Sequence, residues 1–461
     1  MEKASTIIAL FASFGPALTA PTFDNLGILM RGAILASAER TVTACIRAAA
    51  PWAVKHFSAY ENVPRRAKLN ERGLARILFL MIESLIPKGA VVELIADDTL
   101  VRRSGPYVMG IGIHRDPLRT GRGTNYALSL GHKWVVLSVG VRLRFMAGWL
   151  ALPILSELYV SPDPARRSRV TMKKKHRSPA RIAKALVAIV ARWAPERRFH
   201  LICDKVFASH DLADSMNEQG RIPGLRRVTL VSRLQPDAGL YGRPSLFGGR
   251  GRRRVKGEKL PSPGEVAWGP DARWRTVEVA WYGGGRKVVQ LISGAGLWYR
   301  CGTMATWVRW VMVRDPEGRR EDQVIFTTDR ALYSRQIVET FVCRWSLETT
   351  FEETRRHLGL ETLRNRTATA VSNSVPLLLG LYSLIVVWFT VQHGDSKVTI
   401  GAAPWYRKTN VTFSDMLDFA REDVLMDFFL IRRRLKPSVF FLARFPLNII
   451  YSSLAQKTRA A

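Results

Sequence analysis

Acidic and basic side chains share one stripe of the helix that we predict between residues 333 and 361. At about 100° per residue, Arg344, Glu348 and Arg355 fall on the same side of this helix. A carboxylate with guanidinium groups beside it suits a site that holds a cation and a phosphate. An amphipathic surface helix with internal ion pairs is the alternative interpretation.

The ends of this helix are marked by residues that favour helix boundaries. Ser334 is a suitable N-cap and Gly359 a suitable C′ residue, and no Pro or Gly lies between them, so we expect one helix of about six or seven turns. Leu347, Phe351 and Leu358 lie on the flank of the charged stripe. We therefore expect that flank to pack inward.

Two predicted strands from distant parts of the chain end in aspartate. The sequence VVELIADDT ends in Asp97, Asp98 and Thr99, and FHLICDKVF contains Asp204 at the end of its apolar run. One aspartate at a strand end is usually a turn residue, but an α/β sheet gathers the ends of parallel strands at one edge. Side chains alternate between the two faces of a sheet, so only one of Asp97 and Asp98 can join Asp204 and Glu348.

The charge of the chain predicts a polyanionic partner. Seventy Lys and Arg against 38 Asp and Glu leave a net charge of +32 over 461 residues, and 47% hydrophobic residues indicate a globular protein. DNA, RNA and an anionic membrane surface all fit this charge. The four cysteines are scattered without metal-ligand spacing, which argues against zinc fingers and disulfide frameworks and favours a reduced cytoplasm.

The predicted helix resembles the signature of transposases of the IS4 and IS701 type. That signature is Tyr, two residues, Arg-Trp, a spacer, an apolar residue, Glu, six residues and Lys. The spacing is the same here, with Phe341 in place of the Tyr and Arg355 in place of the Lys. The matching residues are Phe341, Arg344, Trp345, Leu347, Glu348 and Arg355.

This resemblance implies an RNase H-like transposase with a catalytic triad of two aspartates and one glutamate. Asp97, Asp204 and Glu348 would be the catalytic residues and would hold two Mg²⁺ ions, for which Mn²⁺ substitutes. The Asp-x-Ser/Thr pattern on the first strand of such nucleases favours Asp97 over Asp98, which remains the competitor. The resemblance also implies that residues at the positions of Arg344, Arg355 and Phe341 contact the DNA.

The implied activity is metal-dependent strand cleavage and strand transfer at the ends of an insertion sequence, as in cut-and-paste transposition. The substrates would be double-stranded DNA with terminal inverted repeats and a target DNA, and joining two ends favours a homodimer. The implied location is the cytoplasm of a prokaryote, at the nucleoid. An inactive, domesticated or decayed DNA-binding derivative is the alternative, because Phe341 and Arg355 depart from the family pattern.

The fold class expected is α/β, an RNase H-like core with a β-rich insertion and with helical regions at both ends. We predict a helical region over residues 1–86 that binds the DNA end or only packs on the core. The first part of the core spans 87–238, the insertion 239–326, the second part of the core 327–395 and a basic helical region 396–461. The insertion is rich in Gly, Arg and Trp with alternating strands, and the resembling transposases carry such an insertion at this point.

Two basic segments and one apolar segment have competing interpretations. Residues 166–177 and 248–259 could follow the DNA backbone or be solvated connections. Four tryptophans of the insertion could stack on a base, although small-sheet core is the ordinary role. Residues 375–391 are at the short limit for a membrane span, and we expect a buried core helix and no membrane partner.

Overall fold

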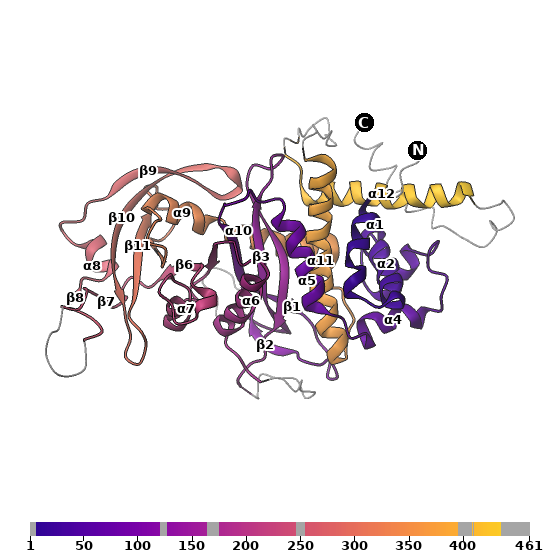
Figure 1. The fold of residues 1–461 in the computed structure, drawn as a ribbon, viewed down its shortest axis with the longest axis horizontal. Coiled ribbons are helices and arrows are strands. Elements are labelled where there is room, and N and C mark those ends of the chain that lie inside the picture. The colour runs from indigo at the N-terminus through magenta and orange to yellow at the C-terminus, as the bar shows by residue number, and fades with distance from the viewer. Residues whose placement is uncertain are drawn as a thin grey trace.

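The computed structural model describes residues 6–119, 127–163, 175–245, 254–394, 408 and 410–434. Within these residues one mostly antiparallel sheet of twelve strands is packed with helices on both faces, which makes a mixed α/β fold (Figure 1). The strands are β1 (Val92–Arg102), β2 (Gly112–Arg115), β3 (Leu128–Arg142), β4 (Trp149–Leu158), β5 (Phe199–Cys203), β6 (Val228–Leu234), β7 (Leu240–Tyr241), β8 (Lys259–Leu260), β9 (Arg275–Ala280), β10 (Arg286–Trp298), β11 (Thr306–Arg314) and β12 (Gln323–Thr327).

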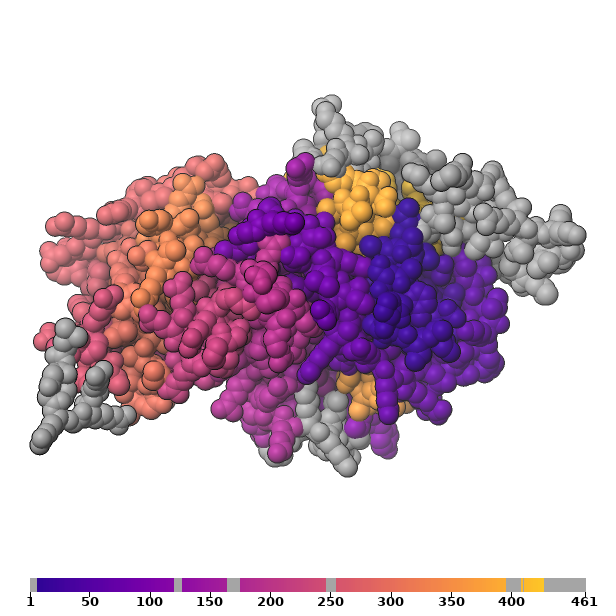
Figure 2. Space-filling model, viewed as in Figure 1, coloured from indigo at the N-terminus to yellow at the C-terminus, as the bar shows by residue number. Residues whose placement is uncertain are grey.

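The helices divide between the two ends of the chain and the connections of the sheet. They are α1 (Thr6–Phe11), α2 (Ala20–Leu35), α3 (Val42–Ala48), α4 (Phe57–Arg66), α5 (Glu71–Glu83), α6 (Pro179–Trp193), α7 (His210–Ser215), α8 (Pro263–Trp268), α9 (Ser334–Val342), α10 (Trp345–Leu358), α11 (Ala368–His393) and α12 (Phe413–Arg434). Helices α1, α2 and α4 lie at one end of the molecule and strands β7 to β11 at the other, while α5 lies nearer the middle, beside α11 (Figures 1 and 2).

Five strands in the order β4-β3-β1-β5-β6 surround the first predicted aspartates. β1 is antiparallel to β3, and β3 is antiparallel to β4. β1 is parallel to β5, and β5 is parallel to β6. Because a parallel connection needs a crossover, α6 lies between β4 and β5 in sequence and packs back against β1 and β3.

The strands expected between residues 239 and 326 are present as part of the same sheet. β12 pairs with β6, and β11, β10 and β7 follow in order, so that these strands extend the sheet instead of forming a second one. β10 is long enough to pair with β11 on one side and with both β9 and β7 on the other. The division of the chain into five regions stays a prediction. Parts of both basic segments, at 164–174 and 246–253, lie outside the described residues.

Helix α11 is an internal helix of the fold. It passes the length and composition test for a membrane span, but 72% of its most apolar window is buried inside the protein. It packs against β4, α4, α5 and α12. The prediction of a buried core helix over 375–391 is therefore confirmed. Residues 395–407, 409 and 435–461, which include Lys436 of the predicted basic C-terminal region, lie outside the described part of the chain.

Two charged side chains, the buried Arg40 and the half-buried Asp423, tie the N-terminal helices to the rest of the fold. Arg40 is 3% exposed and donates hydrogen bonds to the carbonyls of Ala33 (2.8 Å), Ala38 (2.7 Å) and His357 (2.7 Å). Burial lowers the pKa of this guanidinium to about 10. On α12, Asp423 accepts the backbone N–H groups of Thr6 (3.1 Å) and Ile7 (3.0 Å) at the start of α1. Such contacts satisfy donors and acceptors that helix ends leave unpaired.

The prediction of one continuous helix over residues 333–361 is wrong. Two helices, α9 and α10, are joined by a tightened turn at Cys343 and Arg344. There, the N–H of Arg344 donates to Phe341 (3.1 Å) and that of Leu347 to Arg344 (3.1 Å), three residues back instead of four. The Ser346 hydroxyl also donates to the Cys343 carbonyl (2.7 Å), which competes for an acceptor of the helix.

The ends and the buried face of this helix pair agree with the sequence in part. Helix α9 begins at Ser334, so its N-cap is Tyr333 and not Ser334 as predicted. Gly359 follows α10 with φ 58° and ψ 42°, the left-handed conformation that favours glycine, which confirms the predicted C′ residue. The inward packing of Leu347, Phe351 and Leu358 is also confirmed, since all three are buried.

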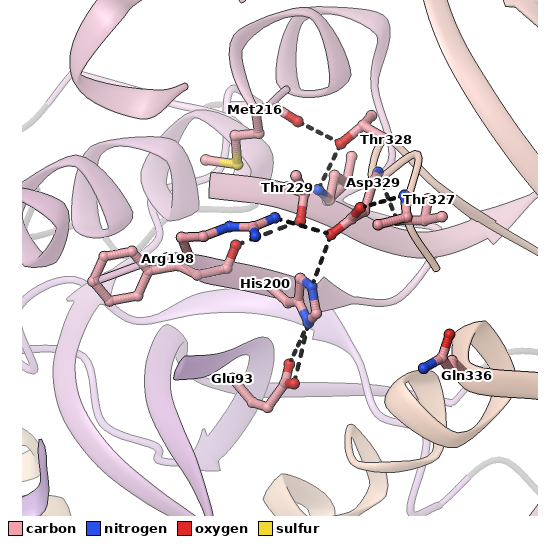
Figure 3. A network of polar contacts seen from close by, with 12 residues as sticks. Glu93, Arg198, His200, Met216, Thr229, Thr327, Thr328, Asp329 and Gln336 are labelled. Carbon is pink, nitrogen blue, oxygen red and sulfur yellow. Dashed lines mark hydrogen bonds and ion pairs between the residues drawn. The ribbon is translucent and has the colours of Figure 1, made fainter. Parts of the chain in front are cut away.

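A buried histidine between two carboxylates joins β5 to β1 and to the loop after β12 (Figure 3). His200 Nδ1 lies 3.0 Å from Glu93 Oε2, and His200 Nε2 lies 3.2 Å from Asp329 Oδ2. Burial lowers the pKa of His200, but hydrogen bonds to Asp329 and Glu93 outweigh it and raise the pKa to about 9. The imidazole is thus a cation at neutral pH that holds three segments of the sheet together.

Candidate active site

Parallel pairing of β1 and β5 brings two of the predicted acids together. The register pairs Ala96 with Cys203, so Asp97 and Asp204 are the next residues on two adjacent strands. β5 ends at Cys203, whereas β1 continues to Arg102. Both aspartates lie four residues beyond the buried Glu93–His200 contact, and therefore about 13 Å along the strands from it.

Alternation along β1 places Asp97 and Asp98 on opposite faces of the sheet. Ile95, two residues before Asp97, belongs to the same buried cluster as Leu347 of α10. Ala96, two residues before Asp98, belongs to the cluster on the other face. Asp97 therefore faces the helix that carries Glu348. Asp98 instead pairs with Lys133 of β3, with 2.9 Å between Asp98 Oδ2 and the ammonium nitrogen.

The guanidinium of Arg344 bridges the first and third predicted acids. Arg344 Nη1 lies 2.7 Å from Asp97 Oδ2, and Arg344 Nη2 lies 2.7 Å from Glu348 Oε1. The first contact joins α10 to β1, and the second is an i, i+4 pair within the helical segment. Asp97, Asp204 and Glu348 all act electrostatically on this guanidinium. Arg344 thus contacts the first and third predicted acids directly, and the charge of the second, Asp204, acts on it from farther away.

Burial and charge act in opposite directions on these groups. Burial raises the pKa of Asp97 to about 7, although the Arg344 guanidinium favours its carboxylate form. Burial lowers the pKa of Arg344, but the charges of Asp97, Glu348 and Asp204 outweigh it and raise that pKa. Arg344 therefore stays protonated and compensates a group of acids that would otherwise repel one another.

The donor set has the chemistry that Mg²⁺ requires. Carboxylate oxygens are hard ligands, and Mg²⁺ needs few of them because it keeps several waters. Asp204 Oδ1 is buried without a hydrogen bond, and the nearby Arg233 guanidinium is 3.7 Å away. In the part of the chain that the structure describes, however, no three acidic, histidine or cysteine side chains converge closely enough to hold a metal ion. The acids fit a metal by type, while a guanidinium lies between two of them.

The other two predicted DNA contacts have partners inside the protein. Arg355 donates to the Thr99 hydroxyl within β1, and its Nε lies 3.4 Å from Glu361 Oε1. Phe341 is 5% exposed and packs in the core below Arg344, whose guanidinium carbon lies 5.8 Å from the ring centroid. Phe341 thus supports the guanidinium from below, and its ring is not at the surface.

Two cations beside the acids were not predicted from the sequence. Lys133 lies on β3 beside Asp98, and Arg233 lies on β6 beside Asp204. The available signal was a charged residue within a strongly apolar strand, which is costly to bury unless it is paired. That signal identifies a partnered cation but not its partner, because the strand order decides which residues meet.

One comparison with known proteins identifies the family of the chain. The family model described as "DDE superfamily endonuclease" matches residues 13–288, more than half of the sequence. The matched range contains β1 and β5 with Asp97 and Asp204, and it ends before Glu348. Comparison with curated proteins finds no match. With two adjacent strand aspartates inside the matched range, the chain belongs to the DDE superfamily endonucleases.

Proposed function

We propose that this chain is a DNA transposase of the IS4/IS701 type, which cuts and transfers DNA strands at the ends of an insertion sequence. The observation that carries the proposal is the pair of 2.7 Å contacts by which Arg344 joins Asp97 of β1 to Glu348 of α10, with the charge of Asp204 acting on the same guanidinium. Membership of a family of endonucleases supports it. The strand order β4-β3-β1-β5-β6, with its last two strands parallel to β1, supports an RNase H-like core.

In this proposal Asp97, Asp204 and Glu348 are the catalytic residues and the ligands of two Mg²⁺ ions. When bound, the ions activate the attacking oxygen and stabilise the leaving 3′-oxygen of the phosphodiester. Asp97 and Asp204 are fixed by the pairing of their strands, and Glu348 is presented by a helix anchored to β4 through the Thr350 hydroxyl, 2.8 Å from the Ala151 carbonyl. Arg344 orients a phosphate, with Phe341 supporting its guanidinium.

Arg355 has a different place in this proposal from the one that the family signature implies. Its hydrogen bond to Thr99 joins α10 to β1, and its ion pair with Glu361 joins it to the segment that follows α10. We therefore propose that Arg355 keeps Asp97 aligned with Glu348, and that it contacts DNA only through the exposed part of its side chain. The protein would act as a homodimer at the prokaryotic nucleoid, and its substrate would be a DNA duplex with inverted repeats at its ends.

The experiment that tests the proposal compares two glutamates on the same helix. Glu348 faces Arg344, whereas Glu352, one turn later, is 63% exposed and pairs with Arg356. Purified chain is incubated with DNA that flanks its reading frame, in Mg²⁺, and the products are resolved by strand. We expect Glu348→Gln to lower cleavage about 100-fold or more and Glu352→Gln to leave it unchanged. Asp97→Asn and Asp204→Asn should match Glu348→Gln.

Two results would decide against an active transposase. Equal cleavage by the unaltered chain and Glu348→Gln would remove the assigned site. Salt-sensitive DNA binding without cleavage, in Mn²⁺ as well as Mg²⁺, would favour the alternative of an inactive DNA-binding derivative. The bridging of Asp97 and Glu348 by Arg344 is the structural feature that favours that alternative, because a site locked in this way has no open position for a cation.

A further inference from the structure

We propose that Arg344 is a counter-cation that closes the acidic site until a DNA phosphate draws it away, so that DNA and divalent cation bind cooperatively. This inference rests on the proposed function, because it assumes that Asp97, Asp204 and Glu348 are cation ligands. It adds an order of binding: the DNA-free chain holds its own guanidinium between the acids, and the cation takes its place only in the DNA complex.

The contacts of Arg344 satisfy the acids as a bound cation would. Its two terminal nitrogens each lie 2.7 Å from a different carboxylate, one on β1 and one on α10. The side chain is only 14% exposed, so water screens its positive charge weakly and charge–charge energies are large. A divalent cation placed between the same oxygens would lie against the guanidinium, and the two positive charges would repel. Guanidinium and cation therefore exclude each other.

The guanidinium is also incompletely bonded in this position. Arg344 Nε is buried and donates no hydrogen bond. A phosphate, by contrast, accepts from two guanidinium nitrogens at once, which gives planar, charge-assisted bonds. An incoming phosphodiester therefore offers Arg344 an acceptor that the closed site does not.

The backbone around Arg344 is held in place, so that its side chain can move while its backbone stays fixed. The residue lies in the tightened turn between α9 and α10, where the N–H of residues 343, 344 and 347 bonds three residues back. The Phe341 ring below and the Ser346–Cys343 hydrogen bond fix this turn. Motion of the side chain alone is therefore sufficient to open the site, and Glu348 and Asp97 keep their backbone positions. Because the two binding equilibria are linked, the factor by which DNA raises the affinity for the cation equals the factor by which the cation raises the affinity for DNA.

The test measures Mn²⁺ binding directly, by the electron paramagnetic resonance of free Mn²⁺, with no cleavage assay. The key variant is Arg344→Gln. The matched control is Arg356→Gln, because Arg356 makes the same i, i+4 contact at 2.7 Å on the same helix but is 62% exposed. The unaltered chain and both variants are measured without DNA and with a short duplex. The Asp97→Asn variant is measured with the same duplex, and this control gives the amount of Mn²⁺ that the DNA itself binds.

We expect Arg344→Gln without DNA to bind Mn²⁺ at least about tenfold more tightly than the unaltered chain, and Arg356→Gln to match the unaltered chain. Adding duplex should raise the Mn²⁺ affinity of the unaltered chain by a similar factor and that of Arg344→Gln by less. If circular dichroism shows that Arg344→Gln is unfolded, the effect of duplex on the unaltered chain decides by itself.

Two results overturn the proposal in distinguishable ways. Tight Mn²⁺ binding by the DNA-free unaltered chain, abolished by Asp97→Asn, would refute closure by Arg344 and keep the proposed catalytic site. Absence of Asp97-dependent Mn²⁺ binding in every form, with and without duplex, would refute both the closure and the metal-dependent function.

Discussion

The buried imidazolium of His200 stabilises the folded protein, and we expect this stabilisation to be lost at alkaline pH. Its pKa is about 9 in the folded chain, against an ordinary value of 6.5. The folded state therefore binds this proton more tightly than the unfolded state. The contribution to stability is fully present below pH 6.5 and is lost as pH rises through 9. A difference of about 2.5 pKa units corresponds to about 3 kcal/mol.

The perturbation that isolates this effect replaces the network by neutral side chains of similar shape. In a triple variant with Glu93→Gln, His200→Gln and Asp329→Asn, no member of the network titrates. The free energy of unfolding is measured by urea denaturation for both chains between roughly pH 6 and 10. The advantage of the unaltered chain over the variant should shrink by about 3 kcal/mol across this range.

A second measurement tests the pKa of His200 without assuming that the protein unfolds in two states. Proton NMR of the imidazole C–H signals, with His200 assigned by its absence from a His200→Gln sample, follows the titration directly. We expect a midpoint near 9, because both ring nitrogens face carboxylates. His132 provides the contrast, since burial lowers its pKa to about 4 beside the Met109 carbonyl. A His200 midpoint at or below 6.5, or a pH-independent stability difference, would refute the reasoning.

Three further substitutions test how the helices are held to the sheet, each by chemical denaturation. Arg40→Met removes hydrogen bonds to three carbonyls, one of them in a buried contact, and should cost about 3 kcal/mol. Arg364→Met, at a side chain 68% exposed, should cost less than about 0.5 kcal/mol, and equal costs would contradict the role of Arg40. Gly359→Ala should cost about 1–2 kcal/mol because φ is 58°, whereas Gly224→Ala, with no atom within 4 Å of the added Cβ, should be near neutral. Asp423→Ala removes the acceptor at the start of α1 and should cost about 1–2 kcal/mol; no loss would show that water replaces it.

The sequence by itself determined the features that depend on neighbouring residues. Two apolar runs that end in acid predicted the strands that carry Asp97 and Asp204, because a buried strand needs continuous apolar residues. Gly359 predicted a helix end, because glycine adopts the left-handed conformation at no steric cost. The long apolar run at 375–391 predicted a core helix. Each of these depends on the preferences of a short segment, which the rest of the fold does not change.

Only the tertiary structure decided which of these side chains meet. Alternation along the strand separates Asp97 from Asp98 but does not say which face α10 covers, and only the resemblance to the transposase pattern favoured Asp97. That resemblance also predicted DNA contacts for the guanidinium groups at 344 and 355, and in the folded chain the first bridges Asp97 and Glu348 while the second donates to Thr99 of β1. Spacing along a helix fixes which side chains share its surface, whereas the partners on the facing strand depend on sheet order and register. For that reason the acids and Arg344 were visible in the sequence, and the bridge that Arg344 makes between Asp97 and Glu348 was found only in the folded chain.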